Sequence, residues 1–366
     1  MKVIAIYLPQ FHAFPENDEW WGEGYTEWTA VRNAKPLYRG HMQPKAPLDG
    51  VYYDLAKDGV GTLKKQAELA KKYGIYGFMF YQYYFKGRKL MEKPLEILLN
   101  NPDIDLRYSL CWANESWTRA WYDKSEEVLL KQEYGNEADW EEHFKYLLPF
   151  FRDKRYIKID GKPVFHIYRT FEIEELSKIA DYFNNRAKEE GFEGIFLIGG
   201  LTAAKLEDRA DVRERFGGWY YFEPGYTLKH NMSPAASLEY NICVAARHFI
   251  NIFKKDKLLE RRIPIRHIYD GIASREYASD EFPGLLAGWD NTPRRGYKGL
   301  VYTGSEPRIF GELLNKLKEK TAGRKNDFIY INAWNEWGEG AMIEPDRQFK
   351  NGYLEEIRRV QDETAS

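Results

Sequence analysis

The chain has 366 residues, of which 43% are hydrophobic and 30% are charged, and its 54 Lys and Arg nearly balance 56 Asp and Glu. This balance provides no basic face, which argues against a nucleic-acid partner. Two cysteines, Cys111 and Cys243, and seven scattered histidines exclude a disulfide framework and a clustered transition-metal site, so no metal and no cofactor are expected.

Residues 1–12 form a short apolar run that is broken by Pro9 and lacks the cleavage site of a signal peptide. This pattern predicts a first strand at 2–8 and a cytoplasmic protein. No segment approaches the ~20 apolar residues that cross a bilayer, so no membrane span is expected.

Short β-rich runs then alternate with helical patterns along the whole chain. Gly74 and Gly191 are predicted to end two of the helices. The seventh strand is either 265–271 or the stretch that ends at Trp289. The other strands are predicted at 75–82, 107–113, 163–169, 194–200, 217–223 and 327–334. Helices are predicted at 60–73, 91–100, 137–153, 172–190, 235–254, 306–322 and 351–361.

Eight strands that alternate with helices indicate parallel pairing, because each crossover helix returns the chain to the same edge of the sheet. An open doubly wound sheet would carry a glycine-rich turn after its first strand, whereas residues 9–12 contain no glycine. The sequence therefore predicts an α/β fold, a (β/α)₈ TIM barrel with long βα loops, as one catalytic domain over residues 1–366.

Catalytic groups of this fold lie at the C-terminal ends of the strands, and the residues predicted there are polar, acidic and aromatic. Aromatic residues make up 16% of the chain; their rings can stack on sugars, although they can also simply fill a large barrel. The predicted substrate-binding residues are Tyr7, Gln10, His12, Glu27, Trp28, Tyr81, Gln82, Tyr84, Trp112, Asn114, Glu115, Trp117, Tyr168, Arg169, Trp289, Asp290, Asn291, Arg294, Trp334, Asn335 and Trp337.

The densest cluster follows the eighth strand, where Glu336 and Glu339 are three residues apart. On a helical turn this spacing places the two Cβ atoms about 5–6 Å apart. Two close carboxylates have pKa values that are pushed apart, which suits one as an acid and the other as a base in glycoside chemistry. Gly338 and Gly340 relieve the tight turn. A pair of solvated surface carboxylates is the alternative, and Glu115 is a second, weaker candidate.

A competing motif is Asp103-Ile104-Asp105, a pattern that binds a metal and a nucleotide-sugar diphosphate in some glycosyltransferases. It precedes the third predicted strand, which places it at the face of the barrel opposite the expected site. Arg119, Arg169, Arg294 and Arg295 could nevertheless hold a diphosphate.

The segments 7–12, 16–31, 111–121, 155–169, 288–295 and 332–346 resemble the WbsX family. Its members are bacterial proteins, often tied to O-antigen and other surface polysaccharides, labelled glycosyltransferases and described as glycoside hydrolase family 99-like. The family 99 relation rests mainly on 335–340. It implies a retaining endo-α-mannosidase mechanism, in which Glu336 assists the sugar 2-hydroxyl to form a 1,2-anhydro intermediate and Glu339 acts as general acid and then general base.

Three hypotheses follow from these patterns. The preferred one is retaining cleavage or transfer of an α-mannoside-like bond in a bacterial surface polysaccharide or oligosaccharide, without metal or nucleotide. The second is a glycosyltransferase that depends on a nucleotide sugar. The third is a glycan-binding barrel without catalysis, against which the presence of both Glu336 and Glu339 argues.

Overall fold

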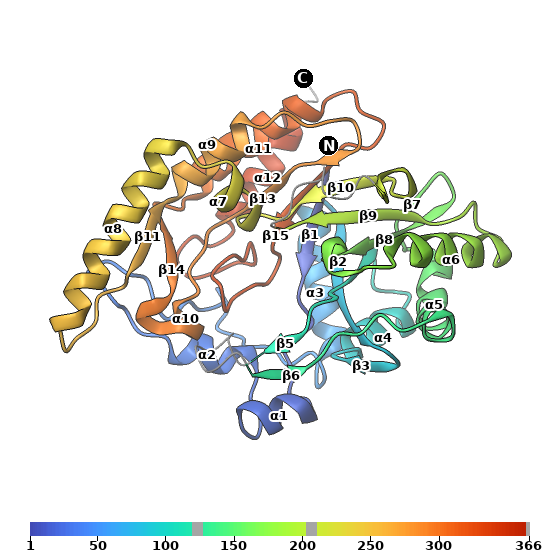
Figure 1. Cartoon of the computed structure of the whole chain (residues 1–366), viewed down its shortest axis with the longest axis horizontal. Helices are drawn as coiled ribbons and strands as arrows, with labels where there is room; N and C mark the ends of the chain where they lie inside the picture. The colour runs from blue at the N-terminus through green and yellow to red at the C-terminus, as the bar shows by residue number, and fades with distance from the viewer. Residues whose placement is uncertain (119–126, 203–210, 364–366) are drawn as a thin grey trace.

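The protein is described by a computed structural model that covers residues 1–118, 127–202 and 211–363 (Figure 1). Parallel strands form a barrel in the order β1, β2, β4, β8, β9, β10, then the split strand β12–β13, then β15 and back to β1. This is the predicted (β/α)₈ architecture. The barrel strands are β1 (Lys2–Tyr7), β2 (Ile75–Phe85), β4 (Tyr108–Trp112), β8 (Lys162–Ile167), β9 (Phe196–Leu201), β10 (Gly218–Tyr221), β12 (Glu281–Phe282), β13 (Gly284–Leu286) and β15 (Phe328–Asn332).

The seventh barrel strand is interrupted at Pro283, which has no N–H to donate to a neighbouring strand. β12 pairs with β10 on one side, and β13 pairs with β15 on the other. The carbonyl of Pro283 accepts a hydrogen bond from the N–H of Tyr330 at 2.9 Å, so the ring of strands closes around the interruption. The first alternative for this strand, 265–271, is wrong because those residues form a helix; the second, which ends at Trp289, contains the observed strand.

Side chains alternate between the barrel interior and the helical layer, as the period of two in a strand requires. One layer of the interior is formed by eight buried side chains, one from each strand, and other residues of the same strands form the rest of it. His166 donates or accepts a hydrogen bond with the Tyr330 hydroxyl at 2.9 Å across it. The eight are Ile4, Met79, Cys111, His166, Ile198, Tyr220, Phe282 and Tyr330. The opposite faces of the same strands pack against the helices and form the larger core cluster.

The helices surround the barrel. Gly74 and Gly191 follow two of them with φ of 76° and 88°, a region that glycine enters without strain. The helices are α1 (Pro15–Trp21), α2 (Glu27–Asn33), α3 (Gly59–Lys72), α4 (Lys93–Asn100), α5 (Glu137–Arg152), α6 (Leu176–Glu189), α7 (Gly225–His230), α8 (Pro234–Phe253), α9 (Ile265–Ser274), α10 (Thr292–Arg295), α11 (Pro307–Thr321) and α12 (Gly352–Asp362). The seven predicted helices are present with bounds that differ by no more than four residues, whereas α1, α2, α7, α9 and α10 were not predicted. In the described part of the chain no helix has the length and apolar character needed to cross a membrane.

Smaller elements decorate the barrel. β3 (Arg88–Leu90) forms a hairpin with the long end of β2, and β7 (Lys158–Ile159) forms one with β8. β5 (Trp117–Thr118) pairs with β6 (Val128–Leu130) beside the barrel mouth. β11 (Arg261–Pro264) and β14 (Leu300–Thr303) form a separate parallel pair between the barrel and α8.

A buried ion pair fixes the region after β10. Arg275 donates to the Glu223 carboxylate at 2.9 Å and to the Thr227 hydroxyl at 2.8 Å, and the two charged side chains are 6% and 0% exposed. The guanidinium also lies 4.1 Å from the ring centre of Tyr221. Glu223 therefore has a structural partner of its own.

We expect Arg275→Met to lower the free energy of unfolding by about 3–5 kcal/mol, because it leaves the Glu223 charge buried without a partner. The double variant Glu223→Gln/Arg275→Met should lose less than the single one. Chemical denaturation of the three proteins tests this, and equal losses for the single and double variants would contradict it.

Candidate active site

The loop after β15 places the two predicted carboxylates at the mouth of the barrel. It folds back on itself through hydrogen bonds from the Ala341 N–H to the Glu336 carbonyl at 3.0 Å and from the Ile343 N–H to the Ala333 carbonyl at 3.0 Å. Asn335 ties the loop to β1, because its side chain exchanges hydrogen bonds with the N–H and carbonyl of Leu8 at 2.8 and 3.0 Å. The loop is thus held from both sides, which suits it to present reactive groups.

The buried guanidinium of Arg294 contacts both carboxylates of this loop and a third carboxylate, that of Glu27 in α2. Arg294, whose side chain is 2% exposed, lies 3.0 Å from Glu336, 3.1 Å from Glu339 and 2.7 Å from Glu27. Glu336 also accepts the backbone N–H of Glu339 at 3.1 Å, and Gln10 donates to Glu27 at 3.3 Å. Five predicted site residues therefore form one connected cluster.

Three carboxylates around one cation leave an excess of negative charge. Burial raises the pKa of Glu336, and the neighbouring Glu339 and Glu27 raise it further, whereas Arg294 lowers it. Burial also raises the pKa of Glu339, with Glu27 acting in the same direction and Arg294 against it. The Glu336 side chain is 5% exposed and that of Glu339 is 25% exposed, so Glu339 is the one open to solvent. The pKa of Glu336 is raised to about 8 and that of Glu339 is raised as well, so both carboxyls hold a proton more readily than a solvated glutamate does.

The two glycines of the loop serve different purposes. Gly340 has φ of 61°, the left-handed region in which a side chain is strained. Gly338 has no such φ, but a Cβ there would lie 2.2 Å from Glu27 Oε1 and 2.7 Å from Arg294 Nη2. The backbone at Gly338 therefore forms part of the wall against which the guanidinium and its carboxylate partner are held.

Glu344 anchors the same loop from behind, and the sequence analysis did not select it. Its carboxylate accepts the indole N–H of Trp334 at 3.0 Å, that of Trp337 at 2.7 Å, the Gln66 amide at 2.6 Å and the Tyr53 hydroxyl at 3.0 Å. Burial nonetheless raises the pKa of Glu344 to about 7. The sequence did offer one sign of this residue: Glu344 follows Trp334 and Trp337 by ten and seven residues, in the same glycine-containing loop.

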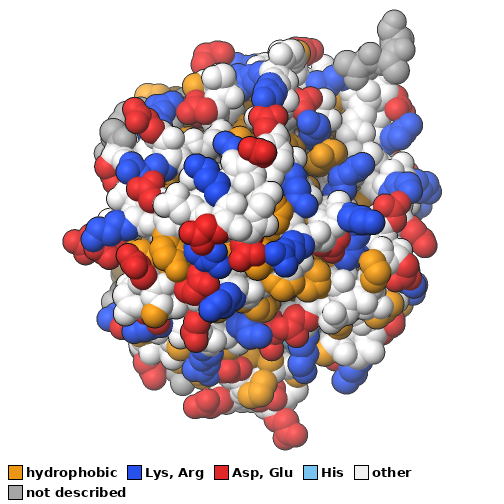
Figure 2. Space-filling model, turned by 90° about the vertical axis from the view of Figure 1, so that its right-hand side faces the viewer, with side chains coloured by type: hydrophobic (Ala, Val, Ile, Leu, Met, Phe, Trp, Pro, Cys, Tyr) orange, Lys and Arg blue, Asp and Glu red, His pale blue; other side chains and the backbone are white. Residues whose placement is uncertain are grey.

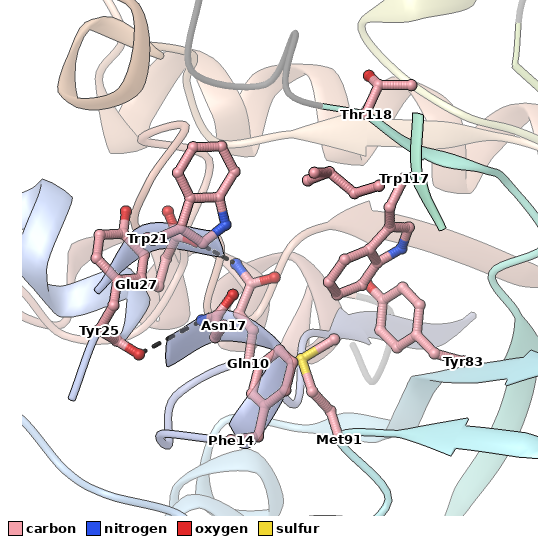
Figure 3. Close-up of a pocket in the computed structure, with 11 residues that line it drawn as sticks. Gln10, Phe14, Asn17, Trp21, Tyr25, Glu27, Tyr83, Met91, Trp117 and Thr118 are labelled. Atoms are coloured by element: carbon pink, nitrogen blue, oxygen red, sulfur yellow. Dashed lines mark hydrogen bonds between the residues drawn. The ribbon is translucent and has the colours of Figure 1, made fainter. Parts of the chain in front are cut away.

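An aromatic pocket opens beside Glu27 and Gln10. In Figure 3, Trp21 and Tyr25 stand on one side of it and Trp117 and Tyr83 on the other, with Asn17 and Gln10 between them. Asn17 donates to the Tyr25 carbonyl at 3.4 Å, which fixes part of this wall. The remaining lining residues are Phe14, Met91, Thr118 and Leu129. Rings on two sides and amides between them match the faces and hydroxyls of a sugar.

A second acidic group lies on the adjoining rim, after β4 and β8. Glu115 forms an ion pair with Arg169, which also pairs with Glu172 at 2.9 Å. Burial raises the pKa of Glu115, and Arg169 opposes this. Asn114 accepts the Arg169 N–H at 2.8 Å and donates to its carbonyl at 3.0 Å, so hydrogen bonds join the two loops.

Consecutive residues at a strand end do not all reach the mouth, which corrects part of the prediction. Tyr81, Tyr83 and Tyr168 belong to the barrel-interior cluster, and the rings of Tyr81 and Tyr168 are 5.6 Å apart. The alternate residues Tyr7, Gln82, Tyr84, Trp112 and Trp334 instead contact the helical layer or the loops behind the barrel. Tyr7 donates to Gln66 of α3, Gln82 meets His143 of α5 at 3.1 Å, and Tyr84 stacks on His143 at 4.0 Å. These five pack against other parts of the chain. Tyr83, which was not among the predicted substrate-binding residues, lines the aromatic pocket.

Other predicted residues support the rim. Asp290 binds His41 at 2.7 Å and Gln43 at 2.6 Å, and its N–H donates to the Glu339 carbonyl at 2.6 Å. Asn291 accepts the Leu300 N–H at 2.7 Å, and Trp28 packs on Trp337 at 5.4 Å. Trp289 lines a neighbouring pocket with Tyr38 and Lys45. His12 is 1% exposed, and burial lowers its pKa to about 4, so it is neutral.

The competing acidic motif lies at the other end of the barrel, as predicted. Asp103 pairs with Lys64 at 2.6 Å, and Asp105 pairs with Lys71; both acids precede β4. Within residues 1–118, 127–202 and 211–363, no three His, Cys, Asp or Glu side chains are arranged to hold a metal ion. Arg119, together with Trp121 of the same loop, lies outside the described residues.

Comparison with known proteins adds to this geometry. The model of the family described as "Glycosyltransferase WbsX" matches residues 3–357. The chain belongs to the WbsX family. Two WxcX proteins of Xanthomonas campestris pv. campestris are 33% and 32% identical to it over 363 residues. These alignments cover 98% of this chain and 49% of each relative, so the chain spans about half their length.

Solved structures share the fold at low sequence identity. The GH99 endo-alpha-mannosidase from Bacteroides thetaiotaomicron is 14% identical with a TM-score of 0.59, and the alignment covers 99% of this chain and 97% of that one. A glycoside hydrolase-like protein is 13% identical with a TM-score of 0.60, over 98% of this chain and 93% of that one. The family and these structural neighbours are carbohydrate-active proteins.

We expect Gly338→Ala to lower the free energy of unfolding by about 1–3 kcal/mol, because the added methyl group displaces Glu27 or Arg294. Gly288→Ala is the matched control, since its Cβ would lie 3.2 Å from the Ser305 hydroxyl, an end that can rotate. Thermal and chemical denaturation of both variants tests this. An unchanged free energy of unfolding for Gly338→Ala would contradict this, because it would mean that Glu27 and Arg294 can shift without cost.

Proposed function

We propose that this WbsX protein is a retaining enzyme that cleaves or transfers glycosidic bonds, with Glu336 and Glu339 as its catalytic residues. The observation that carries the proposal is the shared contact of both carboxylates with buried Arg294, beside an aromatic pocket. The proposed substrate is an α-mannoside-like bond of a bacterial surface polysaccharide, acted on in the cytoplasm without metal or nucleotide.

The charge of the cluster supports an acid and a base in the same site. Arg294 is a permanent cation, and Glu27 is its closest carboxylate at 2.7 Å. With Glu27 ionised, one proton shared between Glu336 and Glu339 leaves the whole cluster with a charge of minus one. Two coupled carboxylates with raised pKa values then supply one proton donor and one proton acceptor at neutral pH.

The proposed reaction has two steps. In the first, Glu336 takes the proton of the sugar 2-hydroxyl while that oxygen attacks the anomeric carbon, and Glu339 protonates the departing oxygen. In the second, Glu339 takes a proton from water or an acceptor hydroxyl, which opens the 1,2-anhydro ring at the anomeric carbon, and Glu336 returns its proton to O2. Two inversions at the anomeric carbon give net retention. The greater exposure of Glu339 suits the residue that meets leaving group and water.

The aromatic pocket supports an extended substrate rather than a single sugar. Gln10 and Glu27 belong to both the carboxylate cluster and the pocket lining, so the pocket is continuous with the catalytic groups. Trp21 and Trp117 are placed to stack on a ring adjacent to the one that reacts.

The family description favours transfer from a nucleotide sugar as a second candidate. Among the arginines proposed to hold a diphosphate, Arg294 contacts three carboxylates and Arg169 contacts two. Guanidinium groups that already pair with carboxylates are poorly placed to bind a diphosphate, which favours cleavage or transfer without a nucleotide sugar. Calorimetric titration with a panel of nucleotide sugars separates the two, since saturable binding would support the second.

We expect Glu336→Gln and Glu339→Gln each to lower kcat/KM on a natural glycan by about 10²–10⁴-fold, because each removes a proton transfer in the transition state. Glu339→Gln should retain far more activity on an aryl glycoside with an acidic leaving group, which departs without protonation. Product analysis on polysaccharide panels and on aryl glycosides measures both effects.

Glu23→Gln is the matched control, an exposed carboxylate of the α1–α2 loop that should have wild-type activity. Full activity in Glu339→Gln on the natural glycan would refute the assignment. Product formation that requires an added nucleotide sugar, and persists in both catalytic variants, would replace it with the glycosyltransferase.

We expect Glu27→Gln to shift both limbs of the pH–rate profile to lower pH by roughly half a unit or more. Glu27 raises the pKa values of Glu336 and Glu339, so its neutralisation lowers both. Activity should then rise on the acid side, where the base must lose its proton, and fall on the alkaline side, where the acid must keep one. An unshifted profile for Glu27→Gln, with Glu23→Gln as the control, would show that Glu27 does not act on the pair.

A further inference from the structure

Helix α8 (Pro234–Phe253) exposes large apolar side chains to solvent, whereas a surface helix usually turns such side chains to the core. Its inward face carries Tyr240, Arg247 and Asn251, and it rests on β11 and the loop that follows the helix. In Figure 1 it forms the left edge of the molecule, with no element outside it. Only Ala236 and Asn251 of its twenty residues are fully buried. The apolar side chains of α8 therefore point to solvent.

The exposed apolar side chains form one stripe. Among the described residues ten large apolar side chains are strongly exposed, and six of them lie on α8: Leu238 at 62%, Ile242 at 59%, Phe249 at 62%, Ile250 at 46%, Ile252 at 61% and Phe253 at 76%. At 1.5 Å per residue, the stripe from Leu238 to Phe253 is about 22 Å long. Contiguous apolar patches larger than a few hundred Å² are rare on the surface of monomeric proteins, and six large side chains that are 46% to 76% exposed form such a patch.

Basic side chains gather at the C-terminal end of the stripe. Residues 247–262 contain six Lys or Arg and two acids, but Arg247, Arg261 and Arg262 contact other parts of the chain. The exposed cations are Lys254, Lys255 and Lys257, with the exposed acid Asp256 among them. One of the acids, Glu260, lies 3.2 Å from His248 and 3.1 Å from the Asn251 amide. Exposed Lys254, Lys255 and Lys257 directly follow Phe253. On the opposite side of the molecule, shown in Figure 2, basic and acidic side chains are interspersed.

The loop that carries these cations is fixed rather than loose. Asn251 accepts the Leu258 N–H at 2.7 Å and donates to its carbonyl at 2.9 Å, and Lys257 donates to the Asn251 carbonyl. Phe249 and Phe253 contact each other edge to face at 5.4 Å. The structure thus presents aromatic rings and ammonium groups together at one end of the helix.

We infer that α8 docks the protein on an anionic lipid surface, with its apolar stripe in the interfacial region and Lys254, Lys255 and Lys257 on the lipid headgroups. An apolar helical face with flanking cations is the arrangement that binds such surfaces. The exposed lysines at the end of the stripe complement anionic headgroups, whereas a second copy of the chain carries the same cations, which favours the lipid surface. This inference does not depend on the proposed reaction.

The test is co-sedimentation of the full chain with vesicles of phosphatidylglycerol and phosphatidylethanolamine, compared with vesicles of phosphatidylcholine alone. Wild type should bind the anionic vesicles at about 0.1 M salt and bind far less at about 1 M. Phe249→Ser/Phe253→Ser should lower the partition coefficient by about tenfold or more, because it removes the apolar contact. Lys254→Glu/Lys255→Glu should lower it similarly on anionic vesicles only.

Two matched controls keep the test specific. Leu48→Ser/Val51→Ser removes exposed apolar side chains elsewhere, and Lys154→Glu/Lys188→Glu reverses exposed cations on another face. Both should bind as wild type does, and circular dichroism confirms that each variant is folded. Absence of binding to anionic vesicles would overturn the inference, as would undiminished binding by Phe249→Ser/Phe253→Ser. A dimer in sedimentation velocity that this variant abolishes, without vesicle binding by wild type, would assign the stripe to a second copy.

Discussion

The guanidinium of Arg294 is the constraint on which the candidate site depends. It is 2% exposed, and it contacts carboxylates from two separate loops, Glu27 of the first βα loop and Glu336 and Glu339 of the last. A buried cation requires such partners, and buried carboxylates require such a cation. The same contacts set the protonation of Glu336 and Glu339, because the cation lowers pKa values that burial and Glu27 raise. Arg294 therefore both holds the two loops together and lowers the pKa values of the two carboxyls.

Around this cluster the scaffold is built to resist movement. Glu344 holds two indoles of the catalytic loop, Asn335 holds the loop to β1, and Asp290 holds it to the loop that carries Arg294. Polar groups with full sets of partners fix positions more sharply than apolar contacts alone. The two candidate carboxylates can thus remain close together despite their mutual repulsion, with the aromatic pocket beside them.

The outer helix α8 differs from the barrel mouth, because it exposes apolar side chains to solvent instead of burying polar ones. α8 exposes Phe249 and Phe253 beside a group of lysines, outside the β11–β14 pair. A surface that docks on lipid and a site that accepts a glycan place different demands on side chains, and the chain separates them. The barrel carries the proposed reaction, and an element outside the barrel carries the proposed attachment.

The alternation of strands and helices, the strand-end clusters and the motif at 335–340 determined the barrel and both catalytic candidates from sequence alone, because periodicity and parallel crossovers admit few folds. Local pattern could not decide between 265–271 and the later stretch for the seventh strand, since both are short apolar runs. It also could not choose which of two neighbours, Gln82 or Tyr83, faces inward. Only the tertiary structure brought Glu27 to Arg294, 267 positions away, and Glu344 to Gln66, 278 positions away. Such contacts depend on how the barrel closes, and no local pattern encodes that closure.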